Sequence, residues 1–176
     1  YKIMETIAGD GFVLNQEVKE FEITPQEQTI NFDIQSVQYK NERQRLQIEA
    51  QKKDKENEMP LSGAVFGLYV TEDIYTNIVY DAASGKWIIR DAPVVAVPAG
   101  TFIKACVTGI DGKGIFAGEL PLGKYEIKEL TPPTGYLPTE ETVLVDASYD
   151  GPHGGQFVQI QRHVGIFHNE RSDKPT

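Results

Sequence analysis

Residues 125–137 read YEIKELTPPTGYL, and a degraded copy of this stretch, YKIMETIAGDGFVL, occupies residues 1–14. Apolar and polar residues alternate in the first half of the stretch, and Pro and Gly follow them, which predicts a strand that ends in a turn. The Tyr, the Glu and the Gly-aromatic pair of the two copies lie 124 residues apart. The tripeptide NER at 41–43 also returns at 169–171, after 128 residues, so we expect four extra residues in the loop YDGPHGGQ.

The repeat defines the expected domain organisation. Residues 44–171 contain one complete copy of the repeating module, and residues 1–43 match only its second half. We therefore predict a tandem array, in which 1–43 is the C-terminal half of an upstream module, 44–171 is a complete module and 172–176 is a linker. Glu5 and Asn41 are then the upstream equivalents of Glu129 and Asn169.

Composition predicts an all-β chain that folds around a core. Of the 176 residues 40% are hydrophobic, and short runs rich in β-branched and aromatic residues are separated by Gly, Pro, Asp and Asn. Asp111-Gly112 predicts a hairpin between two such runs. The net charge of -9 with scattered Lys and Arg argues against a nucleic-acid partner. No apolar run is long enough for membrane insertion in this segment.

Alternation along three of the predicted strands places polar groups at the ends of apolar rows. Leu46, Ile48, Ala50 and Lys52 share one face of the first strand of the module. By the same rule Glu129 extends the row that begins at Tyr125 and Ile127, and Asn169 follows Phe167 in the last strand. Burial of these three polar groups is costly unless they meet one another, so we expect Lys52, Glu129 and Asn169 to lie together in the core.

Two interpretations of such a cluster remain open from the residues alone. A buried Lys-Glu ion pair with Asn169 as a hydrogen-bonding partner needs no reaction and is the simpler one. Alternatively, burial favours the neutral forms of a lysine and a glutamate, and a neutral Lys52 amine could attack the Asn169 carboxamide. Glu129 would donate a hydrogen bond to the amide oxygen and relay protons to the nitrogen, which departs as ammonia. Because only one turnover is needed, fixed and dry reactants could supply the rate.

A resemblance favours the second interpretation. The stretch LQIEAQKKDKENEMPLSGAVFGLYV, residues 46–70, resembles the opening of a Cna-B-type repeat, a prealbumin-like or SpaA-type pilin module of Gram-positive surface proteins. GIFAGELPLGKYEIKELTPPTGYL, residues 114–137, and FHNE, residues 167–170, resemble its later phrases. The resemblance implies an immunoglobulin-like or prealbumin-like β-sandwich in tandem repeats. It also implies an intramolecular isopeptide bond from Lys52 to Asn169, with Glu129 as its catalyst.

The resemblance further implies a structural stalk module of a cell-wall-anchored pilin or adhesin, outside the cell. Its partners would be neighbouring modules of the same surface protein or pilus. Apart from the single-turnover reaction we expect no enzymatic activity and no cofactor. We also expect no metal site, since His163 and His168 would lie on opposite faces of one strand. The alternative function is a ligand-binding adhesin domain for a glycan or host matrix protein, built on residues 72–104, whose aromatic residues include Trp87. The simpler interpretation of 72–104 is an inserted hairpin that caps the sandwich.

Overall fold

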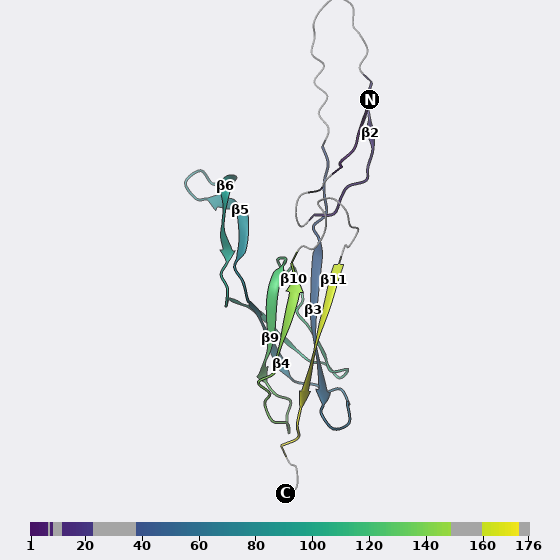
Figure 1. Cartoon of the computed structure of the whole chain (residues 1–176), viewed down its shortest axis with the longest axis vertical. Helices are drawn as coiled ribbons and strands as arrows, with labels where there is room; N and C mark the ends of the chain where they lie inside the picture. The colour runs from purple at the N-terminus through teal and green to yellow at the C-terminus, as the bar shows by residue number, and fades with distance from the viewer. Residues whose placement is uncertain (7, 9–11, 23–37, 149–159, 173–176) are drawn as a thin grey trace, which may run out of the picture. The chain divides into compact units, whose positions relative to one another are not determined.

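The structure is a computed structural model that describes residues 1–6, 8, 12–22, 38–148 and 160–172 (Figure 1). Every regular element in these residues is a β-strand, which confirms the predicted all-β class. None of the described segments forms a helix that is long and apolar enough to cross a membrane. The chain divides into two compact units. Unit 1 holds the described residues within Tyr1–Arg45 and Tyr149–Ile160, and unit 2 holds those within Leu46–Ser148 and Gln161–Thr176.

Two short strands, β1 (Lys2–Ile3) and β2 (Lys19–Glu20), pair antiparallel in unit 1. The remaining strands are β3 (Arg45–Asp54), β4 (Val65–Val70), β5 (Ile74–Asp81), β6 (Lys86–Val97), β7 (Phe102–Val107), β8 (Lys113–Ile115), β9 (Gly123–Thr131), β10 (Thr142–Ala147) and β11 (Ile160–Asn169). The predicted loop YDGPHGGQ lies outside the described residues.

Unit 2 is a sandwich of two sheets. One sheet has the strand order β10-β9-β4-β7, and the other has the order β11-β3-β8 (Figure 1). The inward apolar rows of both sheets form a single buried cluster, in which Ile48 of β3, Phe66 of β4, Ile127 of β9 and Phe167 of β11 are fully buried. Such a shared core, formed by side chains that alternate along each strand, is what holds two sheets face to face.

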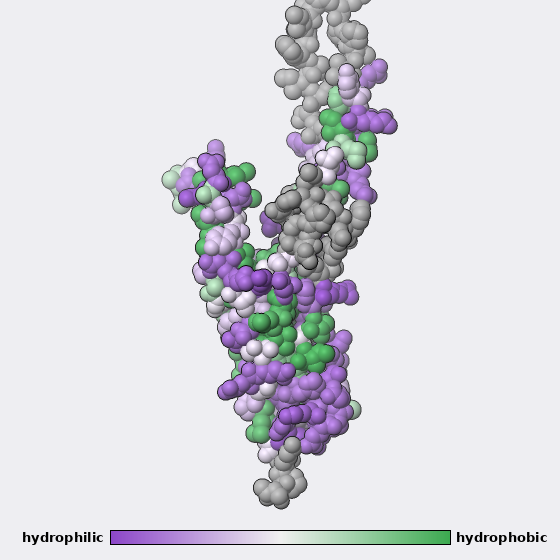
Figure 2. Space-filling view, in the orientation of Figure 1, coloured by the Kyte–Doolittle hydropathy of each residue, from purple (hydrophilic) through white to green (hydrophobic). Residues whose placement is uncertain are grey.

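The segment 72–104 differs from the expected cap. β5 and β6 form a separate two-stranded sheet, and β6 continues through Pro93. Only Ile74 and Val97, at the base of this hairpin, pack against the core. Its outer residues are exposed, and apolar side chains show at its surface (Figure 2). The prediction of a cap was therefore wrong, because only the base of the hairpin packs against the core and the rest of it is exposed.

The predicted turn at Asp111-Gly112 forms, but it does not close a hairpin. Gly112 has a φ of 73°, and its N–H donates to the Gly109 carbonyl at 2.9 Å. The strands on either side belong to different sheets, since β7 pairs with β4 whereas β8 pairs with β3. The turn thus carries the chain across the sandwich. The Asp-Gly dipeptide determines the turn, but it does not determine which strand pairs with the strand that follows.

The single cysteine, Cys106, is buried in β7. Burial raises the pKa of its thiol to about 12, so the thiolate is scarce at neutral pH. This residue is a small apolar member of the core.

Candidate functional site

Three strands from the two sheets each bring one polar side chain into the core of unit 2. Lys52 lies near the end of β3, Glu129 lies in β9, and Asn169 is the last residue of β11. Lys52 is 0% exposed, Asn169 is 1% exposed, and the side chain of Glu129 is 1% exposed. Each of them continues an apolar row, because side chains two residues apart point to the same face of a strand.

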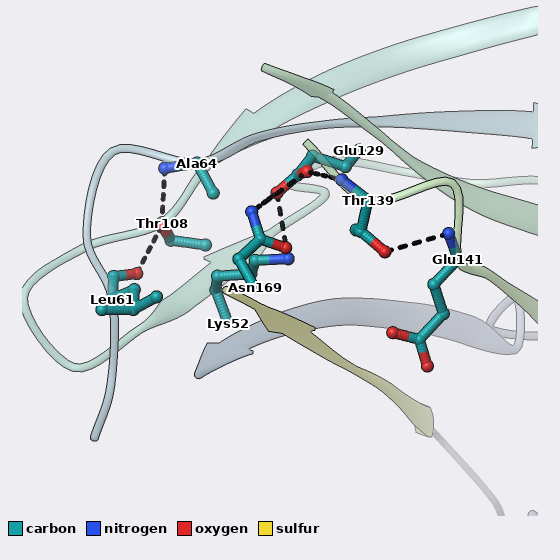
Figure 3. A network of polar contacts seen from close by, with 8 residues as sticks. All are labelled: Lys52, Leu61, Ala64, Thr108, Glu129, Thr139, Glu141 and Asn169. Carbon is teal, nitrogen blue, oxygen red and sulfur yellow. Dashed lines mark hydrogen bonds and ion pairs between the residues drawn. The ribbon is translucent and has the colours of Figure 1, made fainter. Parts of the chain in front are cut away.

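The carboxylate of Glu129 joins the other two side chains (Figure 3). Its Oε1 lies 2.9 Å from Lys52 Nζ. Asn169 Nδ2 donates to the same Oε1 at 2.9 Å and approaches Oε2 at 3.2 Å. Because both nitrogens lie 2.9 Å from one oxygen, they can be no further apart than twice that distance. The amine of Lys52 therefore lies beside the carboxamide of Asn169 (Figure 3).

Aromatic rings surround the amine. Lys52 Nζ lies 5.6 Å from the ring centroids of both Phe66 and Phe167, and these rings pack 4.6 Å apart. Burial lowers the pKa of the Lys52 amine, while the contact with Glu129 opposes this shift. Beyond that ion pair, Lys52 Nζ has no hydrogen-bond partner among the described residues, and Asn169 Oδ1 has none either. An amine that is dry and poorly hydrogen-bonded is closer to its neutral, nucleophilic form than an exposed lysine.

The carboxamide is oriented differently from our expectation. We expected Glu129 to donate to the amide oxygen, whereas the amide nitrogen of Asn169 donates to Glu129. A carboxylate can only accept, so it attracts the N–H₂ end of the carboxamide. In this orientation the nitrogen that would leave, and not the oxygen, lies against the carboxylate of Glu129.

A backbone group that sequence reasoning missed also holds Glu129 in place. The N–H of Thr139 donates to Glu129 Oε2 at 2.9 Å (Figure 3). The side chain therefore has one oxygen fixed by the loop after β9 and the other oxygen facing the lysine and the asparagine. No residue type in the sequence signals this contact, because the donor is main chain.

A second buried carboxylate lies two residues beyond the lysine. Asp54 is 1% exposed and accepts hydrogen bonds from Tyr136 Oη at 2.9 Å and from Arg171 Nε at 3.0 Å. The N–H of Glu56 also donates to it at 2.8 Å, and this contact is the largest cause that lowers the pKa of Asp54 to about 2. The cluster ties the end of β3 to the residues after β11. Alternation from Lys52 could have found Asp54, since the two residues share a face.

The upstream residues Glu5 and Asn41 also meet, within unit 1. Asn41 Nδ2 donates to Glu5 Oε1 at 2.6 Å. Both side chains are half-buried, unlike the cluster in unit 2. Among the described residues, no lysine lies within ion-pair distance of Glu5.

The other residues named in the sequence analysis are not part of this cluster. His168 contacts Glu58 at 3.1 Å on the surface. Trp87 is 71% exposed on the β5–β6 hairpin and packs edge-on against Tyr80. Within the described part of the chain, no group of His, Cys, Asp and Glu could hold a metal ion.

Comparison with known families gives one match over most of the chain. A family model described as SpaA, a prealbumin-like fold domain, matches residues 46–155. No curated protein matches the chain.

Several solved structures are similar to the chain. It aligns with the Bacillus anthracis TIE protein at a TM-score of 0.63 and 22% identity, over 97% of this chain and 25% of that one. It aligns with the T6 backbone pilin of serotype M6 Streptococcus pyogenes at a TM-score of 0.39 and 30% identity, over 58% of this chain and 16% of that one. It aligns with the group B streptococcus pilus 2b backbone protein at a TM-score of 0.46 and 19% identity, over 82% of this chain and 47% of that one. The chain thus spans a quarter of the first structure and less than half of the other two.

Proposed function

Because the chain belongs to the SpaA prealbumin-like domain family, we propose that residues 44–171 form a structural stalk module of a cell-wall-anchored pilin or adhesin. A self-formed amide bond between Lys52 and Asn169 stabilises this module, and Glu129 catalyses its formation. The partners of the module are neighbouring modules of the same surface protein or pilus, outside a Gram-positive cell.

One observation carries the proposal. The amine of Lys52 and the carboxamide nitrogen of Asn169 lie 2.9 Å from the same oxygen of Glu129, in an interior where none of the three side chains is more than 1% exposed. This arrangement holds the amine and the carboxamide close together in a dry interior, which is what a reaction between them needs.

The chemistry follows from the position of each group. Lys52 reacts as the neutral amine. Nζ attacks Cγ of Asn169, and Glu129 takes the one proton that Nζ loses as the bond forms. The new C–N bond forms as the bond from Cγ to Nδ2 breaks, and Glu129 hands the proton to Nδ2, which leaves as ammonia. Glu129 returns to its starting state, and no other reactant is consumed. Amides resist amines in water, but effective molarities of roughly 10⁵ to 10⁸ M for fixed reactants supply the missing rate.

The bond would give the module mechanical strength. It spans 117 residues, from position 52 to position 169, and joins β3 to β11. Tension that enters along β3 and leaves along β11 would pass through a covalent link near their ends, so the strands between them would carry little of it. Unlike a disulfide, this link cannot be opened by thiols. One cysteine leaves no internal disulfide to do the same work.

Intact-mass spectrometry of the chain tests the proposal. The purified protein should be lighter than its sequence mass by one ammonia. Glu129→Gln should keep the full sequence mass, because the variant lacks the proton relay but preserves the size of the side chain. Lys53→Met is the matched control, since Lys53 neighbours Lys52 but pairs with the exposed Glu58, and this variant should still lose ammonia. An unmodified mass for the unaltered chain would overturn the proposal.

The β5–β6 hairpin supports a second candidate function, the binding of a glycan or a host matrix protein. Tyr80 lies opposite Trp87 and Ile78 lies opposite Ile89, and all four side chains are exposed. Aromatic rings in such a position stack on sugars or pack against proteins. An array of glycans and matrix proteins tests this function, with Trp87→Ser as the variant that should lose any signal. Loss of the Lys52-Asn169 bond should leave the signal unchanged.

A further inference from the structure

The main-chain donor that holds Glu129 is itself fixed by a side chain. The N–H of Thr139 donates to Glu129 Oε2 at 2.9 Å, and Thr139 Oγ1 accepts from the N–H of Glu141 at 3.1 Å (Figure 3). A short side chain that accepts from the N–H two residues further on closes a tight turn, and Ser, Thr, Asn and Asp are the residues that do so. Thr139 therefore supplies the N–H and, through its hydroxyl, also sets the path of the main chain that carries it.

The same pair of hydrogen bonds occurs in unit 1 with a different residue. The N–H of Asn15 donates to Glu5 Oε2 at 2.7 Å, and Asn15 Oδ1 accepts from the N–H of Glu17 at 2.9 Å. Asn15 lies 124 residues before Thr139, which is also the interval from Glu5 to Glu129. The side chain differs between the two units, whereas both hydrogen bonds are present in each. What this position requires is thus a short side chain with a hydrogen-bond acceptor, and not the shape of a threonine.

The loop that contains Thr139 also contacts the strand that carries the carboxamide. The N–H of Leu137 donates to the carbonyl oxygen of Glu170, the residue after Asn169, at 2.8 Å. Leu137 and Thr139 are two residues apart, so one short piece of main chain contacts both the end of β11 and the carboxylate of Glu129. A shift of this piece would therefore move Glu129 relative to Asn169.

The turn gives the two oxygens of Glu129 different roles. Oε2 accepts from the main chain of Thr139, whereas Oε1 lies 2.9 Å from both Lys52 Nζ and Asn169 Nδ2. Asn169 Nδ2 lies further from Oε2, at 3.2 Å. Because Oε1 is the oxygen closest to both nitrogens, it is the atom through which a proton passes from the amine to the leaving nitrogen, while Oε2 stays an acceptor.

We propose that Thr139 is a positioning residue for the amide-forming reaction. Its side-chain acceptor closes the turn that directs its N–H at Glu129 Oε2, and this contact holds Oε1 between the amine and the carboxamide. Ser or Asn at this position would serve the same role, because each has a short side chain with an acceptor. The inference rests on the proposed reaction between Lys52 and Asn169, and it adds a residue that acts through Glu129.

Two substitutions of Thr139 separate the turn from simple packing. Val has the shape of Thr but no acceptor, whereas Asn has a different shape and keeps an acceptor. Each chain is made in a short pulse of cell-free translation. Its loss of ammonia is then followed by intact-mass spectrometry, alongside the time at which the chain becomes resistant to protease. The second time course reports folding, so the rate of ammonia loss is compared only among folded chains.

Thr139→Val should lose ammonia roughly 10- to 100-fold more slowly than the unaltered chain, because a misplacement of about 1 Å can slow a reaction between fixed groups on the order of 100-fold. Thr139→Asn and Thr139→Ser should keep most of the rate. Thr142→Val is the matched control, since Thr142 is exposed at the start of β10, and this variant should react as the unaltered chain does.

The outcomes separate this inference from the proposed function. A normal rate in Thr139→Val, or equal slowing in Thr139→Val and Thr139→Asn, overturns the inference and leaves the Lys52-Asn169 bond standing. If Thr139→Val never becomes resistant to protease, Thr139→Asn decides: a rate close to that of the unaltered chain supports the inference, and a slow rate overturns it. Absence of ammonia loss in the unaltered chain overturns the proposed function itself.

Discussion

Replacement of Lys52 by Met removes the proposed bond and little of the packing, because Met is unbranched and of similar length. By the chain-entropy relation used for cross-links, a closed loop of 117 residues contributes about 5 kcal/mol to the free energy of unfolding. For a domain of this size each kcal/mol corresponds to about 4 °C, so Lys52→Met should lower the Tm by about 20 °C. Lys53→Met, which removes only a surface ion pair, should change the stability by less than about 1 kcal/mol.

Loss of a buried ion-pair partner can itself cost roughly 3 to 5 kcal/mol, so the Tm alone does not distinguish the two causes. Urea unfolding distinguishes the loss of the covalent bond from the loss of the ion pair. A cross-linked chain stays partly compact when unfolded and exposes less surface, so the unaltered chain should have a smaller m-value than Lys52→Met. Loss of an ion pair would shift the midpoint and leave the m-value unchanged. Equal m-values for the two proteins would refute the covalent account even if the Tm falls.

Three further predictions concern the neighbours of the bond. Glu129→Gln should leave the chain at its full mass and abolish ammonia release in a refolding time course. The pKa of Asp54 is lowered from 3.8 to about 2, so the contribution of this carboxylate to stability is complete above pH 3.8 and is lost as the pH falls toward 2. The free energy of unfolding of Asp54→Asn should therefore depend less on pH over that range than that of the unaltered chain. An unchanged pH dependence would contradict the role of the hydrogen bond from Arg171 to Asp54. Gly112→Ala should lower the free energy of unfolding by roughly 2 kcal/mol or more, because φ is 73° and the new Cβ would lie 2.6 Å from the carbonyl oxygen of Lys52. This variant should also release ammonia more slowly. An unaltered rate of release together with an unaltered Tm would argue against the placement of the turn.

Alternation along strands explains how much of the cluster could be predicted. Lys52 lies six residues after Leu46 and four after Ile48, and this even spacing alone predicts that its side chain points inward. Glu129 and Asn169 follow in the same way. The rule states only which face a side chain occupies. It does not state which strands are neighbours, and therefore it leaves open the distances that bring the three groups to one oxygen.

The features of the structure that were not predicted depend on contacts that no residue type in the sequence indicates. The N–H of Thr139 is a main-chain donor, and its position is set by the path of the loop between β9 and β10. The β5–β6 hairpin contains as many apolar residues as a core strand, yet most of its length finds no second sheet to cover it. The local pattern specified the two strands of this hairpin, and tertiary packing decided that they would stay largely exposed.

Tandem mass spectrometry of a protease digest tests the central claim most directly, because it locates the bond as well as detecting it. The account predicts one branched peptide in which the side chain of Lys52 is joined to that of Asn169 with the loss of one ammonia. Linear peptides that carry an unmodified Lys52 and an unmodified Asn169 would contradict it, and so would a branch that begins at Lys53.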